Sequence, residues 1–153
     1  MSKNVWGPAT WNLLHCLVLK IDDNIDQKTL EDVKTIISGI ANNLPCPTCT
    51  EHAATFLKKN NFKSVANIET LRYFIFHFHN KVNERLKKPQ IRFEEHIQIY
   101  ANMNLKIVAD HFFSVYRDMS QISVTMMLRS YHRTMLLSEV NQYFMRNQDK
   151  YRL

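Results

Sequence analysis

Glycine and proline are scarce in this sequence. Its 153 residues include two glycines and four prolines. This scarcity argues against an all-β fold, which needs many turns, and against a glycine-rich loop that binds phosphate. Hydrophobic residues make up 45% of the chain, which is enough for one domain to bury a core without disulfides or metals. The composition therefore favours a compact helical protein.

Long apolar runs and clustered charge are also missing. No stretch approaches about 18 consecutive apolar residues, so we expect no membrane span. The N-terminal MSKNVWGPATW has no apolar run after its lysine, which argues against a secretory signal and favours a reducing compartment. The 20 Lys and Arg residues exceed the 14 Asp and Glu residues but are spread along the chain. Such dispersion is typical of a solvated surface, and we expect no nucleic-acid partner.

Cysteine is limited to three residues, too few for a disulfide framework. Two of them, Cys46 and Cys49, lie in the segment LPCPTC. Pro47 suits the first position of a helix, which predicts Cys46 at the N-cap and Cys49 one turn inside. The unpaired N–H groups and the dipole of that helix favour thiolate over thiol. The pattern predicts a redox-active dithiol, whereas the isolated Cys16 is expected to be a small buried hydrophobe.

Helical periodicity dominates the chain. Apolar residues recur every three or four positions over 8–21, 26–43, 47–59 and 68–88. Pro8 suits the first turn of the first helix, and Asp26 is the expected N-cap of the second. Residues 93–116 and 121–145 predict one or two further helices. The predicted fold class is all-α.

The fourth predicted helix carries an unusual set of polar residues. His79, Asn80 and Asn83 lie within five positions, and four aromatic residues precede them: Tyr73, Phe74, Phe76 and Phe78. Buried amides and imidazoles need hydrogen-bond partners, and a flat heteroaromatic cofactor offers both hydrogen bonds and stacking area. We interpret this helix as part of a cofactor site.

The CxxC pair has a second interpretation. It could be half of a zinc site, completed by His52 and one further ligand, since zinc needs four. The available further ligands are His15, Cys16, His77 and His79. The residues alone leave redox chemistry and a redox-inert, zinc-binding helical interaction module open. A thioredoxin-type reductase is a third hypothesis, which the lack of a βαβ pattern disfavours.

Three segments together resemble one protein family. They are WGPATWNLLH at 6–15, LPCPTC followed by His52 at 44–52, and HNKVNERLKKP at 79–89. In order and spacing they resemble the Erv/ALR flavin-linked sulfhydryl oxidases over about residues 5–100, and the compact members from large nucleocytoplasmic DNA viruses most of all. The resemblance implies a four-helix bundle that holds FAD, with a short fifth helix. It also implies a thiol oxidase that forms disulfides and reduces oxygen to hydrogen peroxide.

The resemblance also implies roles for particular residues. Cys46 and Cys49 would be catalytic, with Cys46 attacked by the substrate thiol and Cys49 beside the flavin. The residues implied in cofactor binding are Gly7, Trp11, His15, Cys49, His52, Phe74, His79, Asn80, Val82, Asn83, Leu86 and Lys88; no metal site is implied. Three positions depart from the usual family pattern: Phe74 replaces a common tryptophan, Lys87 a common glycine, and Pro8 a frequent arginine or lysine.

The implied partners are a thiol-bearing protein, for which a viral dithiol relay protein is one candidate, and molecular oxygen. Family members commonly pair through their first two helices, so a homodimer is expected. A viral origin would explain disulfide formation in a reducing cytoplasm during virion assembly. The expected location is therefore the cytoplasm of the infected host cell, with packaging in the virion.

The C-terminal third lies largely outside the resemblance. We expect residues 1–104 to form the oxidase domain and residues 105–153 a helical extension, packed on that domain or at a subunit interface. One helical stripe is predicted from Leu105, Val108, Phe112, Val115 and Tyr116, and further apolar surface from Met126, Met127, Leu128, Met135, Leu136 and Leu137. Together with Met103, Met119 and Met145, three of these residues make the region rich in methionine.

Overall fold

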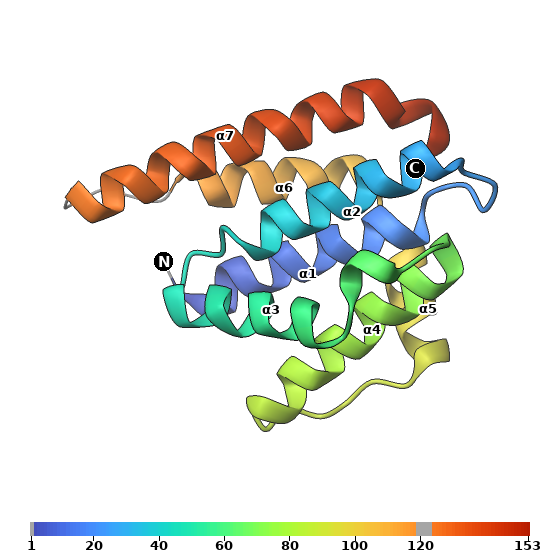
Figure 1. Ribbon diagram of the computed structural model, residues 1–153, viewed down its shortest axis with the longest axis horizontal. Helices are drawn as coiled ribbons and strands as arrows, with labels where there is room; N and C mark the ends of the chain where they lie inside the picture. The colour runs from blue at the N-terminus through green and yellow to red at the C-terminus, as the bar shows by residue number, and fades with distance from the viewer. Residues whose placement is uncertain (1, 119–123) are drawn as a thin grey trace.

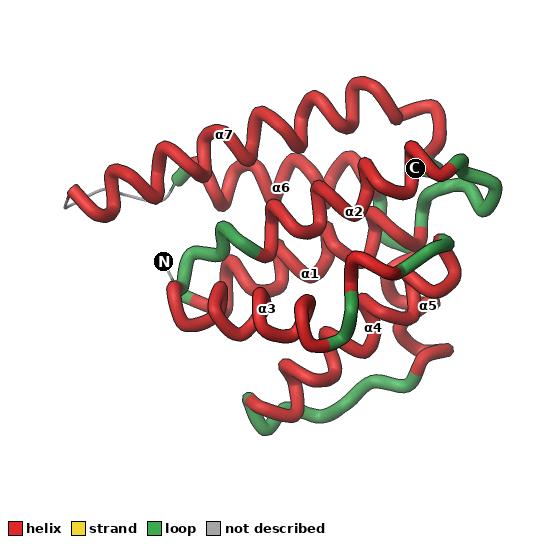
Figure 2. Tube along the Cα trace, viewed as in Figure 1, coloured by secondary structure: helices red, strands yellow, loops and turns green. Residues whose placement is uncertain are grey.

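The computed structural model describes residues 2–118 and 124–153, with side chains for 2–118 and 131–153. These residues form helices joined by short loops and contain no β-strand (Figure 2). The α-helices are α1 (Lys3–Leu19), α2 (Gln27–Ala41), α3 (Pro47–Lys59), α4 (Ile68–Arg85), α5 (Phe93–Ala101), α6 (Leu105–Arg117) and α7 (Val124–Asn147). The predicted all-α fold is confirmed.

Helix α1 lies at the centre of the molecule. It packs against α2, α4, α5 and α6. Figure 1 shows α3 and α4 on one side of α1, and α6 and α7 on the other. Helix α7 packs along α2 and also contacts α6. Within the described residues, no helix combines the length and the hydropathy needed to cross a membrane.

The first helix begins five residues earlier than predicted. Ser2 caps it, because the Ser2 hydroxyl accepts a hydrogen bond from the N–H of Asn4 at 3.0 Å. The expectation that Pro8 lies in the first turn was therefore wrong. Pro8 lies inside α1, where its missing N–H leaves the carbonyl of Asn4 without a helical partner. The cap signal of Ser2 outweighed the proline in setting the start of the helix.

The predicted starts of the second and third helices are confirmed. Asp26 caps α2 by accepting a hydrogen bond from the N–H of Thr29 at 2.7 Å. Cys46 caps α3, with Pro47 as its first residue. The predicted helix over 93–116 is two helices, because the chain turns at 102–104. There the side chain of Asn104 accepts a hydrogen bond from the N–H of Ile107 at 3.1 Å and starts α6.

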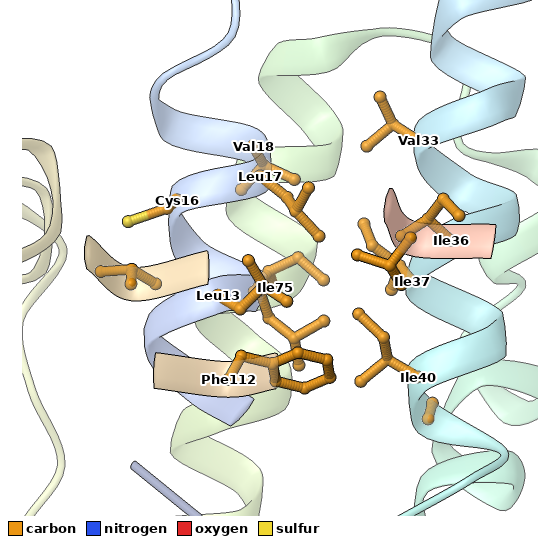
Figure 3. Close-up of a cluster of buried hydrophobic side chains, with 14 of the residues drawn as sticks. Leu13, Cys16, Leu17, Val18, Val33, Ile36, Ile37, Ile40, Ile75 and Phe112 are labelled. Atoms are coloured by element: carbon orange, nitrogen blue, oxygen red, sulfur yellow. The ribbon is translucent and has the colours of Figure 1, made fainter. Parts of the chain in front are cut away.

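The core forms where α1 faces α2. Figure 3 shows Leu13 and Leu17 of α1 pointing toward Ile37 and Ile40 of α2, with Phe112 of α6 beside them. All five side chains are fully buried. The isolated Cys16 is also fully buried, as predicted, and burial raises the pKa of its thiol to about 11. The single core includes residues on both sides of the predicted boundary at 104 and 105, so that boundary stays a prediction.

The extension packs on the bundle. All five residues of its predicted stripe are buried: Leu105, Val108, Phe112, Val115 and Tyr116. Leu136 of α7 is buried too, Leu137 is half-buried, and Met135 is exposed. Met119 and the side chains of Met126, Met127 and Leu128 lie outside the described residues. The extension therefore contributes to the core rather than forming a solvated tail.

The end of the chain holds the C-terminal end of α1. The N–H of Arg152 donates to the carbonyl of Lys20 at 2.8 Å, and the Tyr151 hydroxyl donates to the carbonyl of Leu17 at 2.9 Å. The carbonyl of Leu153 accepts a hydrogen bond from the N–H of Leu105, which is the first residue of α6. The first two contacts satisfy carbonyl groups at the end of α1, and the third satisfies the N–H of the first residue of α6.

Candidate active site

The CxxC pair occupies the start of α3, next to the N-terminal end of α1 (Figure 1). Both cysteines are half-buried free thiols. The sulfur of Cys46 accepts a hydrogen bond from the N–H of Cys49, with 3.3 Å between the nitrogen and the sulfur. This is the N-cap geometry that the sequence predicted. It places a sulfur where the unpaired N–H groups of the helix stabilise negative charge.

The two thiols differ in acidity. Partial burial opposes ionisation of Cys46, but hydrogen bonds from Cys49 and the positive charge of Lys3 outweigh it, so the pKa of Cys46 is lowered. Partial burial raises the pKa of Cys49, and the hydrogen bond to Cys46 and the charge of Cys46 raise it further. In the reduced dithiol, the first proton therefore leaves from Cys46.

A cavity of about 540 Å³ lies beside the dithiol. Side chains of α1, α3 and α4 and of the loop after α4 line it. Nine of the twelve predicted cofactor-binding residues are in this lining: Gly7, Trp11, Cys49, His52, His79, Val82, Asn83, Leu86 and Lys88. Cys49 lines the cavity and Cys46 does not, so the two sulfurs have different surroundings.

The other three predicted residues, His15, Phe74 and Asn80, support the cavity from behind. Phe74 packs edge-on against Phe56, with 5.5 Å between the ring centroids. The amide of Asn80 pairs with the backbone of Ile91: it donates to the carbonyl at 2.8 Å and accepts from the N–H at 3.0 Å. The backbone of the loop after α4 thus gives the Asn80 amide two partners, and the expected contact of Asn80 with a cofactor stays a prediction.

Three histidines form a cluster in the cavity wall and behind it, which we call the histidine cluster: His79 lines the cavity, and His15 and His96 are buried behind it. The His79 ring stacks on Trp11, with 4.0 Å between the ring centroids. Nδ1 of His79 and Nε2 of His15 are 2.8 Å apart and share one hydrogen. The His96 ring lies edge-on to that of His15 at 4.8 Å. Trp11 and His79 thus form a fixed flat surface in the cavity wall.

Burial keeps the histidine cluster uncharged. It lowers the pKa of His79 to about 4, and repulsion from His96 and Lys88 adds to the effect. Burial and the other two histidines also lower the pKa of His15 well below the usual range. Burial lowers the pKa of His96, although the carbonyl of Phe93 opposes this shift. The cluster is therefore neutral at pH 7.

Asn83 presents an unpartnered amide to the cavity. Its side chain is 6% exposed and lines the cavity, yet its amide makes no hydrogen bond within the described residues. The amide atoms stay accessible from the cavity: among the described residues, the fully buried side-chain N and O atoms without a partner are Nδ1 of His15 and Nε2 of His96. The amide of Asn83 is therefore available to a ligand.

The end of α4 places a lysine at the cavity. Lys87 adopts a left-handed conformation with φ of 58°. The N–H of Lys88 then donates to the carbonyl of Asn83 at 2.8 Å, and the N–H of Lys87 donates to that of Glu84 at 3.1 Å. This hydrogen-bond pattern ends a helix and usually uses glycine at the left-handed position. It turns the chain so that Lys88 and Pro89 join the cavity lining.

Comparison with known proteins identifies the family. The sequence profile of the Erv1/Alr family matches residues 8–102. The chain belongs to the Erv1/Alr family. An African swine fever virus protein (isolate Pig/Kenya/KEN-50/1950) named FAD-linked sulfhydryl oxidase is 35% identical over 103 residues, which is 67% of this chain and 86% of that protein. FAD-linked sulfhydryl oxidase ERV1 of Oryza sativa subsp. japonica is 30% identical over 89 residues, 58% of this chain and 45% of that protein.

The zinc alternative has no support in this Erv1/Alr protein. Among the described residues, no group of three His, Cys, Asp or Glu side chains is arranged to hold a metal ion. His15 and His79, two of the proposed ligands, are hydrogen-bonded to each other. The other two candidates, Cys16 and His77, do not form such a group with the dithiol and His52 among the described residues either.

Several cavity residues of this Erv1/Alr protein were missed from the sequence. Lys3, Arg85 and Tyr100 line the cavity, and Tyr100 stacks on His15 with 4.0 Å between the ring centroids. Arg85 lies within the motif at 79–89 and one turn before Lys88, so its place on that helix was a usable signal. Lys3 and Tyr100 carried no such signal, because only the packing of α1 and α5 brings them to the cavity.

Proposed function

We propose that this protein is an FAD-linked sulfhydryl oxidase, which forms disulfides in a protein substrate and reduces oxygen to hydrogen peroxide. The observation that carries the proposal is the position of Cys49. It belongs to a dithiol at a helix N-terminus and also lines a cavity with stacked rings and an unpartnered amide. Membership of the Erv1/Alr family and the names of the relatives support the same activity.

The cavity residues fit FAD. Trp11 and His79 present stacked rings to a flat heteroaromatic group, and Asn83 offers its amide as a hydrogen-bond partner. Lys88 and Arg85 supply positive charge for a pyrophosphate group. Gly7, Cys49, His52, Val82 and Leu86 complete the proposed contacts, and His15, Phe74 and Asn80 hold the wall behind them.

Bound FAD takes an electron pair from a dithiol and passes it to oxygen. The cysteines exchange disulfides with the substrate. A substrate thiolate attacks the sulfur of Cys46 in the Cys46–Cys49 disulfide; the bond between the two cysteines breaks and Cys49 leaves with its electron pair as a thiolate. A second substrate thiolate then attacks the substrate sulfur of the mixed disulfide and releases Cys46 as a thiolate. The substrate gains one disulfide, and both cysteines are reduced.

The surroundings of the two sulfurs support this order. Cys49 faces the cavity, and Cys46 lies at the N-cap outside the lining. When the mixed disulfide is resolved, Cys46 leaves as the thiolate that the N–H of Cys49 stabilises. A leaving thiol of lower pKa departs faster, so the lowered pKa of Cys46 favours release of the product.

The visible spectrum and the oxygen consumption of the purified protein test the proposal. We expect flavin absorbance and oxygen uptake with dithiothreitol. Cys46→Ser and Cys49→Ser should both abolish turnover, and Cys16→Ser should remain active because Cys16 is buried in the core. Cys46→Ser leaves the Cys49 thiolate free beside the flavin and should show a long-wavelength band. The same band in Cys49→Ser would reverse the order of attack, and a colourless, inactive protein would refute the oxidase.

We also propose a substrate protein, a cellular location and an oligomeric state. Similarity to a viral relative supports a viral dithiol relay protein as substrate, action in the cytoplasm of an infected cell, and packaging in the virion.

The homodimer also stays a prediction. Because α6 and α7 pack on α1 and α2, a second copy would have to use surface that these helices leave exposed. Light scattering after size-exclusion chromatography measures the mass, and a mass of 18.2 kDa would contradict the dimer.

A further inference from the structure

Lys3 lies in the cavity lining beside the dithiol. It belongs to none of the three motifs and has no role in the proposed chemistry. It is the first residue of α1, and its side chain lines the cavity together with Cys49 and His52. Gly7 follows one turn later. A Cβ at Gly7 would lie 3.7 Å from Cγ of Lys3, so the lysine stem lies along the helix face that the glycine leaves bare.

The position of Lys3 is unfavourable for the helix itself. The N-terminus of a helix carries partial positive charge, which disfavours a cation in the first turn. The start of α3 lies beside the start of α1 (Figure 1) and adds a second positive helix end. Three positive features thus converge near the two sulfurs. Such an arrangement is stabilised when one sulfur carries negative charge.

The charge of Lys3 acts on both thiols and lowers the pKa of each. For Cys49 it opposes partial burial and the neighbouring Cys46, which both disfavour the thiolate. The cavity holds other titratable or charged groups: His52 on α3, His79 and Arg85 on α4, and Lys88 after it. Among these lining residues, Lys3 is the cation whose charge acts on the thiols.

We propose that Lys3 stabilises the Cys49 thiolate that leaves when a substrate thiolate attacks the Cys46–Cys49 disulfide, an inference that rests on the proposed oxidase function. The substrate sulfur bonds to the sulfur of Cys46, the disulfide bond breaks, and its electron pair stays on Cys49. Lys3 keeps its proton throughout. Its ammonium group lowers the energy of the developing charge and so speeds the exchange.

The test measures Cys49 directly. In the full-length Cys46→Ser protein, the alkylation rate of Cys49 by iodoacetamide is followed by mass spectrometry from pH 6 to 10. An opposite charge within about 4–6 Å shifts a pKa by about 1–3 units. Lys3 is exposed to solvent, so we expect a shift at or below the lower end of that range. Lys3→Met should raise the midpoint by about 0.5–1 pH unit and slow alkylation at pH 7.5 about 3- to 10-fold.

Two variants and a salt series separate charge from shape. Lys3→Arg keeps the charge and should stay within about twofold of the parent rate. Lys28→Met removes an exposed lysine of α2 that pairs with Asp32, and it should change nothing. The effect of Lys3→Met should shrink in 1 M salt, where charges are screened within about 3 Å. An unchanged midpoint in Lys3→Met, or an equal loss in Lys3→Arg, would overturn the proposal.

A second measurement follows the exchange step itself. Dithiothreitol reduces the Cys46–Cys49 disulfide in the otherwise unchanged protein without oxygen, and the rate should fall about 3- to 10-fold in Lys3→Met. Equal rates would contradict the role of Lys3. A protein that binds no flavin and consumes no oxygen would refute the oxidase instead, and both thiol measurements would still report on Lys3.

Discussion

Acid should destabilise this protein through the histidine cluster. Burial lowers the pKa of His79 from 6.5 to about 4, and it lowers the pKa of His15 and His96 in the same direction. An imidazole with a lower pKa in the folded state takes up its proton more readily in the unfolded state. The stability is therefore complete above about pH 7, and it falls as the pH drops through 6.5 toward 4.

The structure sets the size of this effect. For His79 alone, a pKa of 6.5 in the unfolded chain and of about 4 in the folded protein lowers the free energy of unfolding by about 2 kcal/mol between pH 7.5 and pH 5. His15 and His96 change the free energy with the same sign. A loss of this size is a large fraction of the usual 5–15 kcal/mol stability of a domain.

Urea unfolding at pH 7.5, 6 and 5, followed by circular dichroism at a fixed FAD concentration, measures the loss. His79→Phe keeps a ring to stack on Trp11 but cannot be protonated, so its loss between pH 7.5 and pH 5 should be smaller than that of the parent. His111→Gln changes an exposed histidine of α6 and should leave the loss unchanged. Equal free energies at pH 7.5 and pH 5, or the same loss in His79→Phe, would refute the reasoning.

Three single substitutions test other parts of the structure. Asn83→Ala should fold but retain flavin about 5- to 100-fold less tightly, because it removes the unpartnered amide of the cavity; full flavin occupancy after gel filtration would contradict this. Lys87→Gly should raise the free energy of unfolding by about 1 kcal/mol in a urea titration, since Lys87 holds a φ of 58°; no gain would disprove the strain. Phe112→Ala should lower it by about 3–5 kcal/mol, because Phe112 is fully buried; an unchanged thermal midpoint would show that α6 adds little to the core.

Local signals predicted most of the helices because the physics that starts and ends a helix is local. Asp26 and Cys46 each accept a hydrogen bond from a backbone N–H three residues ahead, and both caps were visible in the sequence. The start of α1 was predicted too late because two helix-start signals compete there, and the cap of Ser2 outweighs Pro8. The break before α6 was missed because the apolar period continues across Asn104, whose cap signal competed with it.

Site residues that belong to a sequence motif were predictable. The hydrogen-bond partners of those residues were not, because folding brings them from distant parts of the chain. The sequence marked Asn80 and Asn83 alike as amides in need of a ligand. The loop after α4 brings the backbone of Ile91 to Asn80, and it leaves Asn83 facing the cavity. No local pattern distinguishes Asn80 from Asn83. The difference arises because Ile91, eleven residues after Asn80, packs back against α4 and pairs with Asn80 alone.

The cavity of this protein depends on a residue outside the family match. Thr10 lines the cavity, and its hydroxyl donates to the carbonyl of Trp6 at 2.7 Å. A threonine hydroxyl has one hydrogen, so the Tyr116 hydroxyl, which is 2.7 Å from that of Thr10, must be the donor between them. Burial raises the pKa of Tyr116, so it remains a neutral donor. Tyr116 lies in α6, and the family match ends at residue 102.

The hydrogen bond from Tyr116 therefore joins the extension to the wall of α1 that carries Trp6 and Thr10. A chain that ended at Asn104 would lose this donor and the fully buried Phe112 together. The loss would affect the core and the cavity at once, because both depend on the same face of α1. We therefore predict that removing residues 105–153 would disturb the cavity, although the family match ends at residue 102.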